Sequence, residues 1–187
     1  MATAHVFFGK PVTPDTSTAL IHGCRLLLSE RNEQGVPLWD TFSIAMASGG
    51  GDVVGGFAMF NELKGLPVSV HTHNAGAVDS SAILPFMAGA RRTASEASAF
   101  FFHQLHWVFP SQGNLTMSSI SDAATWLTRY EGLMASIVAS RSNLSKDEVL
   151  RMMSEGTSVD TAQAKQFGLI HDIEEMTSPI GLRSWQV

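Results

Sequence analysis

Hydrophobic and polar positions along the chain alternate with two periods, one typical of strands and one typical of helices. Short apolar stretches predict strands at residues 4–8, 41–47, 68–73, 99–103 and 169–173. Between them lie segments with helical periodicity, at residues 16–30, 53–64, 80–89, 118–142, 145–154 and 161–167. Because strands alternate with helices, we expect an α/β fold with a mostly parallel sheet and helices packed around it.

Turn and capping residues mark the ends of these segments. Asp15 and Thr16 are candidate N-caps for the first helix, and Asp160 is a candidate for the last. Gly65 and Pro67 end the second helix, because glycine favours a helix C-terminus and proline cannot continue one. These signals support the helix boundaries that the periodicity predicts.

The chain shows no internal repeat, low-complexity stretch or linker. Its length therefore predicts one domain over residues 1–187, in which the helix at about 118–142 is the longest element. Residues 91–98 form a connector that could contain a short strand. Residues 177–187 lack periodicity and predict an irregular tail.

Composition and charge narrow the functional classes. Charged residues make up only 16% of the chain, below the usual quarter, which indicates that self-association covers part of the surface. The net charge of -5 and the lack of Lys or Arg runs argue against nucleic-acid binding. The single cysteine, Cys24, excludes an internal disulfide, and the chain has neither a signal-peptide pattern nor a bilayer-length apolar run. We therefore expect a cytoplasmic protein.

A glycine-rich turn joins the second strand to the second helix, with the sequence Ser48-Gly49-Gly50-Gly51-Asp52. Glycines there let the backbone approach a ligand, and the N–H groups of a helix N-terminus favour developing negative charge. The turn lacks the Gly-Lys-Ser/Thr ending of a phosphate loop and the spacing of a dinucleotide-binding loop. It is either a tight connection or a site that stabilises an oxyanion.

Two further segments carry polar residues that acyl-transfer chemistry uses. Ser80 and Ser81 lie where a strand meets a helix of small apolar residues, so they are either helix caps or, for Ser80, a nucleophile. His103 ends an apolar run and is either a buried structural histidine or a general base, with His106 as a competitor for that role. The order of glycine turn, serine and histidine favours the catalytic interpretation.

Another pair of histidines has the spacing of metal ligands. His71 and His73 share one face of a predicted strand. No third ligand is evident in the sequence, so we expect neither a metal nor another cofactor.

Taken together, the three segments resemble the proteolytic subunit of the Clp protease, a serine peptidase of the ClpP/crotonase superfamily. That family has a Ser-Pro-Gly-Gly turn, a Gly-x-Ala-Ala-Ser-Met-Gly segment around its nucleophile and a Met-Ile-His-Gln-Pro segment around its base. The corresponding segments here are residues 48–51, 76–82 and 101–105. Residues 160–170 resemble the family's Ser-Ala-x-Glu-Ala-x-x-Tyr-Gly-Leu-Val ending, and the similarity covers about residues 6–173.

The resemblance implies a fold of repeated β-β-α units with a protruding long helix, and a serine peptidase mechanism. Ser80 would be the nucleophile and His103 the general base, while the backbone N–H groups of Gly51 and Ser81 would bind the oxyanion. The resemblance also implies a homo-oligomer of heptameric or stacked rings. Unfolded polypeptide or peptides would be the substrate, which an ATPase normally delivers.

Three features depart from the family pattern. The family's triad aspartate falls on Gly156, so the adjacent Glu155 is the candidate third member. Asp79 replaces a small apolar residue next to the predicted nucleophile. The chain also lacks much of the N-terminal segment that forms the family's axial loops, which leaves ATPase docking and double-ring assembly open.

Two other functions therefore remain as alternatives. Gly156 and Asp79 favour a catalytically impaired paralogue with an assembly or regulatory role, whereas the pair Ser80 and His103 favours a peptidase. The superfamily also includes crotonase-like enzymes that act on coenzyme A thioesters, usually in a longer chain without a Ser/His pair.

Overall fold

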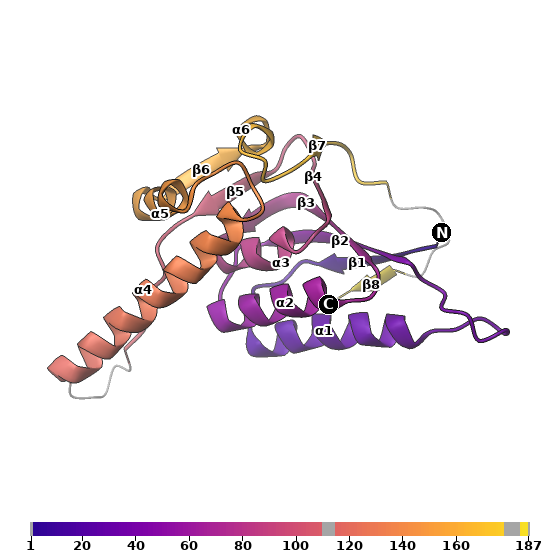
Figure 1. Cartoon of the computed structure of the whole chain (residues 1–187), viewed down its shortest axis with the longest axis horizontal. Helices are drawn as coiled ribbons and strands as arrows, with labels where there is room; N and C mark the ends of the chain where they lie inside the picture. Colours follow the sequence, from indigo (N-terminus) through magenta and orange to yellow (C-terminus); the bar gives the residue numbers. More distant parts are fainter. Residues whose placement is uncertain (1, 110–114, 178–183, 187) are drawn as a thin grey trace.

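Strands and helices alternate along the chain, as the hydrophobic pattern predicts (Figure 1). The computed structural model describes residues 2–109, 115–177 and 184–186. The strands are β1 (Thr3–Phe8), β2 (Thr41–Ser48), β3 (Ser69–Asp79), β4 (Arg91–Ala94), β5 (Ala99–Phe102), β6 (Thr157–Asp160), β7 (Asp172–Ile173) and β8 (Ser184–Gln186). The helices are α1 (Pro14–Ser29), α2 (Val53–Gly65), the 3-10 helix η1 (Ser80–Ala82), α3 (Ile83–Met87), α4 (Met117–Ala139), α5 (Lys146–Glu155) and α6 (Thr161–Gln166).

These strands form one eight-stranded sheet, in which β6, β5, β3, β2, β1 and β8 lie side by side in that order. Strand β4 pairs with β3 and β7, and every pair is parallel except β5 with β6. The long strand β3 pairs first with β4, through residues 71–74, and then with β5, through residues 77–79. This mixed α/β architecture with a mostly parallel sheet confirms the predicted fold class.

The hydrophobic core gathers one face of the sheet with the apolar faces of α1 and α2. In β1 every second residue is buried, so Val6 and Phe8 belong to the core whereas His5 and Phe7 are only partly buried. Leu20 of α1 lies in the same cluster of buried side chains. Because this core fixes the strands, it also fixes the strand ends from which the site residues project.

The N-cap of α1 differs from the prediction. Thr13, rather than Asp15 or Thr16, is the cap. The Thr16 N–H donates to Thr13 Oγ1 at 3.1 Å and the Thr13 N–H donates to Thr16 Oγ1 at 2.8 Å. Pro14 takes the first helical position, where the missing N–H would have had no partner. The predicted cap of α6 is confirmed, because Asp160 Oδ1 accepts a first-turn N–H at 2.8 Å.

Several predicted elements have different extents in the structure. The helix predicted at 80–89 is split into η1 and the five-residue helix α3. The strand predicted at 169–173 is reduced to β7, and the connector at 91–98 does contain a strand, β4. Strand β6 was not predicted, because its four residues show no alternation and are held by antiparallel pairing with the distant β5.

The predicted irregular tail contains a strand. Backbone pairing places residues 184–186 as β8, parallel to β1 at the edge of the sheet. The prediction is wrong for these residues because a free strand edge far away in the sequence decides their conformation. Residues 178–183 and 187 of the tail lie outside the described residues.

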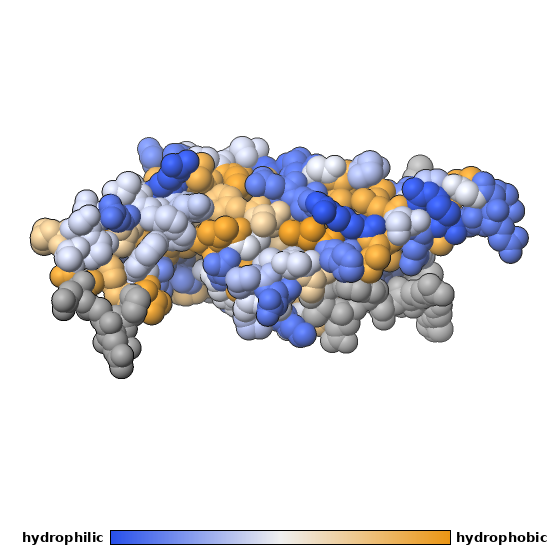
Figure 2. Space-filling view, turned by 90° about the horizontal axis from the view of Figure 1, so that it is seen from below, coloured by the Kyte–Doolittle hydropathy of each residue, from blue (hydrophilic) through white to orange (hydrophobic). Residues whose placement is uncertain are grey.

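Helix α4 extends away from the body of the molecule (Figure 1). Large apolar side chains are exposed around its N-terminal end, and Figure 2 shows apolar residues among polar ones at the end of the molecule where α4 begins. They include Val108, Leu115, Met117 and Ile120. Exposed apolar patches of this kind are typical of protein–protein contacts. None of the helices in the described ranges is long and apolar enough to cross a bilayer.

Candidate active site

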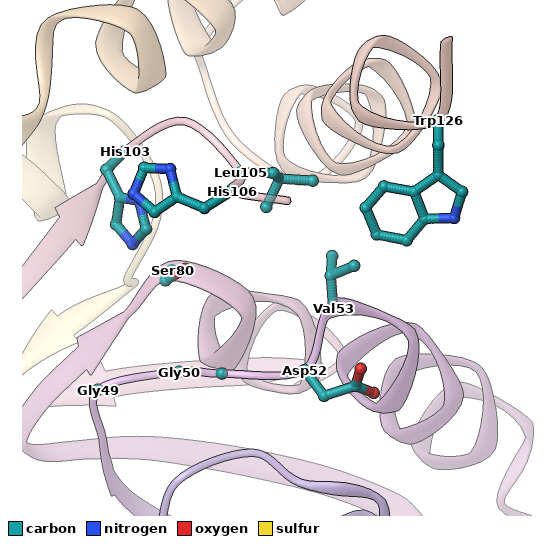
Figure 3. A pocket seen from close by; sticks show the side chains of 10 residues that line it. Gly49, Gly50, Asp52, Val53, Ser80, His103, Leu105, His106 and Trp126 are labelled. Carbon is teal, nitrogen blue, oxygen red and sulfur yellow. The ribbon is translucent and has the colours of Figure 1, made fainter. Parts of the chain in front are cut away.

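A cavity of about 370 Å³ lies between the glycine turn, the segment that follows β5 and helix α4 (Figure 3). Ser80, His103 and Gly51 line it, although they come from three separate parts of the chain. The apolar part of its wall consists of Val53, Leu105 and Trp126. The fold thus brings the predicted nucleophile, the predicted base and one predicted oxyanion residue to a single cavity.

Ser80 occupies the turn from β3 into η1 with a strained backbone. Its φ is 53°, the only positive φ of a non-glycine residue within the described ranges. This left-handed conformation costs a residue with a side chain about 1 kcal/mol or more. The residue is 7% exposed and lines the cavity. A strained junction between a strand and a helix is typical of a catalytic nucleophile.

The glycine turn packs directly against this junction. Gly50 has a φ of 82°, and a Cβ added to it would lie 2.7 Å from Asp79 O and 2.7 Å from Ser80 Cβ. The Val12 N–H donates to Gly50 O at 2.9 Å, which holds the turn in place from the other side. Only glycine fits this close approach of two backbones.

The two predicted oxyanion residues occupy different environments. Gly51 lies on the cavity wall, and its φ of 143° is a backbone conformation that residues with a side chain rarely adopt. Ser81 follows the predicted nucleophile in the first turn of η1, where backbone N–H groups lack intrahelical partners. Its side chain is fully buried, and Ser81 Oγ has no hydrogen-bond partner among the described residues. Any contribution of this residue to the site therefore comes from its backbone.

His103 follows the last residue of β5, and its ring extends toward Ser80 in Figure 3. His103 Nδ1 lies 2.6 Å from the backbone oxygen of Gln104. A carbonyl oxygen can only accept, so Nδ1 carries the proton and donates it. The lone pair of the neutral imidazole is then on Nε2, as a general base requires. Among the described residues no hydrogen bond joins either ring nitrogen to Ser80 Oγ, a looseness that is common before substrate binds.

The position of the family's triad acid offers no carboxylate. Gly156 caps the end of α5 with a φ of 66°. Glu155, the predicted third member, is exposed and lines a separate cavity beside α5 and β6. The structure therefore does not bring Glu155 to the cavity that contains Ser80 and His103.

Asp79 lies where β3 meets η1, directly before the predicted nucleophile. It is the N-cap residue of η1, yet its side chain makes no capping hydrogen bond. Burial raises the pKa of this half-buried carboxyl, while the Phe101 backbone N–H and the nearby charge of His103 act in the opposite direction. Its neighbours across the sheet, which local sequence cannot show, give it a candidate function.

The apolar wall of the cavity was also missed in the sequence. Trp126 of α4 packs against Tyr130 with ring centroids 4.2 Å apart and against Trp107 at 5.2 Å. Tyr130 in turn contacts Phe57 of α2 at 5.5 Å. This aromatic chain connects α4 to the body. Aromatic residues at helical spacing indicate packing, but not which of them faces a cavity.

The histidine pair on β3 does not form a metal site in the structure. His73 makes hydrogen-bond contacts to Thr93 Oγ1 at 2.8 Å and to Ser95 Oγ at 3.0 Å, and burial lowers its pKa. His71 contacts Ser69 Oγ at 3.2 Å. Across residues 2–109, 115–177 and 184–186, no three His, Cys, Asp or Glu side chains gather in a way that could hold a metal ion.

Comparison with known proteins decides the family. A sequence profile described as Clp protease matches residues 1–177. The chain belongs to the Clp protease family. A relative from Treponema pallidum, named ATP-dependent Clp protease proteolytic subunit 2, is 28% identical over 131 residues. That alignment covers 68% of this chain, and the chain spans about 63% of the length of the relative.

Solved structures support the fold of this Clp protease family member. A ClpP1 mutant from Listeria monocytogenes superposes with a TM-score of 0.78, covering 92% of this chain and 91% of the other at 18% identity. At that identity the likeness concerns the fold alone. The arrangement of strands and helices is therefore that of ClpP, and any catalytic chemistry depends on the residues of the cavity.

Proposed function

We propose that this Clp protease family member is a serine endopeptidase that hydrolyses peptide bonds in unfolded polypeptides or peptides. One observation carries the proposal, namely that Ser80, His103 and the glycine turn converge on one cavity. The tautomer of His103 and the strained turn at Ser80 support the same function. Family membership makes a peptidase a better candidate than a thioester enzyme.

The proposed reaction follows the serine peptidase scheme. Ser80 Oγ attacks the carbonyl carbon of the scissile bond, and its proton passes to His103 Nε2. The backbone N–H groups of Gly51 and Ser81 stabilise the resulting oxyanion. Collapse of this intermediate breaks the C–N bond, and the leaving amine takes the proton from Nε2. A water molecule then hydrolyses the acyl-enzyme by the same steps.

Assembly and delivery of substrate form part of the proposal. The relative from Treponema pallidum is named as a subunit of an ATP-dependent protease. By extension, this chain would form a homo-oligomeric ring in the cytoplasm and receive unfolded chains, with an ATPase as the candidate partner. The exposed apolar residues around the N-terminal end of α4 are compatible with contacts between subunits.

A fluorophosphonate probe tests the central claim, because it reacts covalently with activated serines. We expect the wild-type protein to be labelled and Ser80→Ala not to be. Oligomeric state and circular dichroism of both proteins serve as controls for folding. Equal labelling of both proteins would refute Ser80 as the nucleophile.

A catalytically impaired paralogue is the second candidate, and Gly156 is the observation that favours it. Loss of the orienting acid is a large defect in serine peptidases. If well-folded, assembled wild-type protein shows no labelling and no peptide hydrolysis, an assembly or regulatory role becomes the better assignment.

A further inference from the structure

The triad acid of a serine peptidase does two things. It holds the histidine in the tautomer with a free Nε2, and its negative charge stabilises the imidazolium that forms when the serine proton is taken. Since Gly156 has no side chain, other groups must do both if His103 is the base. These groups would be a hydrogen-bond acceptor at Nδ1 and a negative charge near the ring.

The acceptor is present in the backbone. His103 Nδ1 donates to Gln104 O at 2.6 Å. This bond fixes the tautomer without a carboxylate. A carbonyl carries only a partial negative charge, however, so it stabilises the imidazolium less than a carboxylate does.

On the β6 side, the position opposite His103 carries no side chain. Strand β6 runs antiparallel to β5, with Phe102 opposite Thr157, so the next pair in register is His103 and Gly156. A Cβ on Gly156 would have one neighbour within 4 Å, Phe101 Cζ at 3.8 Å. This flank has room for a side chain but supplies none.

On the β3 side, a carboxylate faces the same way as His103. Asp79 pairs with Phe101, which lies two residues before His103. Alternation along β5 buries Phe100 and Phe102 in the core and leaves Phe101 and His103 on the opposite face. Strand spacing and rise place the backbones of such diagonal neighbours about 8 Å apart, within reach of two side chains that lean toward each other.

The carboxylate of Asp79 has no cationic side-chain partner other than His103 in the described structure. It does not cap η1, it forms no ion pair with Lys or Arg among the described residues, and it is half-buried. The other titratable groups that line the cavity or contact this segment have interactions of their own. Asp52 caps α2, Glu131 Oε1 accepts the Leu105 N–H at 2.9 Å, and the His106 ring stacks on His103 with centroids 5.3 Å apart.

We propose that the work of the triad acid is divided in this chain: the Gln104 carbonyl holds the tautomer of His103, and the Asp79 carboxylate stabilises its imidazolium. Both act through His103, so they are positioning groups rather than catalytic residues. The inference deepens the proposed peptidase function and rests on it for its catalytic meaning. The electrostatic contact between Asp79 and His103 is nevertheless a property of the folded protein without substrate.

The first test measures this contact directly. The Asp79→Asn variant removes the charge while keeping an oxygen that can accept the Phe101 N–H. We expect the NMR ring signals of His103, recorded at one fixed pH, to differ between Asp79→Asn and the wild type, because the substitution removes a nearby negative charge. The His103 signal is assigned by its absence from His103→Gln.

The second test measures the catalytic consequence. Peptide hydrolysis and fluorophosphonate labelling should be about tenfold slower in Asp79→Asn at neutral pH, with the acidic limb of the kcat/KM profile moved to lower pH. Glu155→Gln is the matched control, since it removes a carboxylate from the neighbouring flank, and its rates should equal those of the wild type. A purely structural role of Asp79 would slow both reactions without moving the acidic limb.

A rescue experiment uses the empty flank. Gly156→Asp in the Asp79→Asn background introduces a carboxylate opposite His103 and should recover part of the rate. Gly156→Asn in the same background places a side chain of similar size on the same left-handed backbone but adds no charge. It should recover none of the lost rate.

The outcomes separate the inference from the proposed function. Unchanged His103 ring signals in Asp79→Asn overturn the inference, whatever the activity. An active wild type with equal rates in Asp79→Asn also overturns it, and leaves the peptidase proposal intact. If the His103 signals change in Asp79→Asn but the wild type neither labels nor hydrolyses, the contact is supported and the peptidase is refuted.

Discussion

At the scale of single residues, the site depends on how closely two backbones approach. Gly50 leaves no room for a side chain between the glycine turn and Ser80, whereas a Cβ on the neighbouring Gly49 would have no neighbour within 4 Å. The two adjacent glycines therefore form a natural pair of test and control positions.

We predict that Gly50→Ala destabilises the protein by about 2 kcal/mol or more, since its left-handed φ and the contact with Ser80 both oppose a methyl group. Gly49→Ala should change stability by less than about 1 kcal/mol. Urea unfolding measures both. The rate of fluorophosphonate labelling should fall only in Gly50→Ala, and equal effects of the two substitutions would show that the turn is not tightly packed.

Much of the cavity wall could be predicted from single residues and their order. The small residues around Ser80, the glycines before Asp52 and the histidine after an apolar run occur in an order that pointed to one site, and the fold brings them together. The surroundings of Asp79 could not be predicted, because they depend on which strand lies beside β3 and in which register. Trp126 was missed for a similar reason, since helical spacing does not reveal which aromatic residue borders an opening.

At the scale of elements, the start of α6 shows whether Asp160 is a capping residue or a catalytic one. Asp160 lies near the missing acid in sequence, but its carboxylate bonds to the first turn of α6. We predict that Asp160→Ala lowers the free energy of unfolding by about 1 kcal/mol, the usual cost of an N-cap. Its labelling rate should equal that of the wild type. A large drop in labelling at unchanged stability would instead give Asp160 a part in the site.

Helix α4 contributes an apolar wall to the cavity through Trp126. If this wall receives a substrate side chain, Trp126→Ala should reduce kcat/KM about tenfold for peptides with a large apolar residue before the scissile bond. Peptides with a small residue at that position should be much less affected. Parallel loss for both peptide classes would indicate that Trp126 supports the fold of α4 rather than substrate selection.

Local periodicity predicted the long elements better than the short ones. Helices α2, α4 and α5 carry their own amphipathic pattern, caps or stop signals, and their boundaries were close to those observed. Strands β6 and β8 are short segments that depend on pairing with remote strands, so their own residues could not identify them.

At the scale of the whole molecule, the exposed end of α4 is the clearest candidate for subunit contact. Met117 is 81% exposed and Ile120 is 45% exposed, with no described residue covering them. We predict that the double variant Met117→Asp, Ile120→Asp shifts the protein toward smaller species in sedimentation velocity and leaves its circular dichroism unchanged. Asp substitutions at the exposed polar positions Ser118 and Ser121 provide the control. The same distribution of species in all three proteins would exclude this surface from the assembly.

The left-handed backbone of Ser80 connects the proposed chemistry to a measurable difference in stability. Glycine adopts a φ of 53° with less strain than serine does. Neither Ser80→Gly nor Ser80→Ala keeps a nucleophile. We predict that Ser80→Gly is more stable than Ser80→Ala by about 1 kcal/mol in urea unfolding, because only glycine relieves the left-handed strain. A hydroxyl at this position therefore lowers the stability of the fold relative to glycine, so the proposed nucleophile and the most stable backbone are incompatible at residue 80.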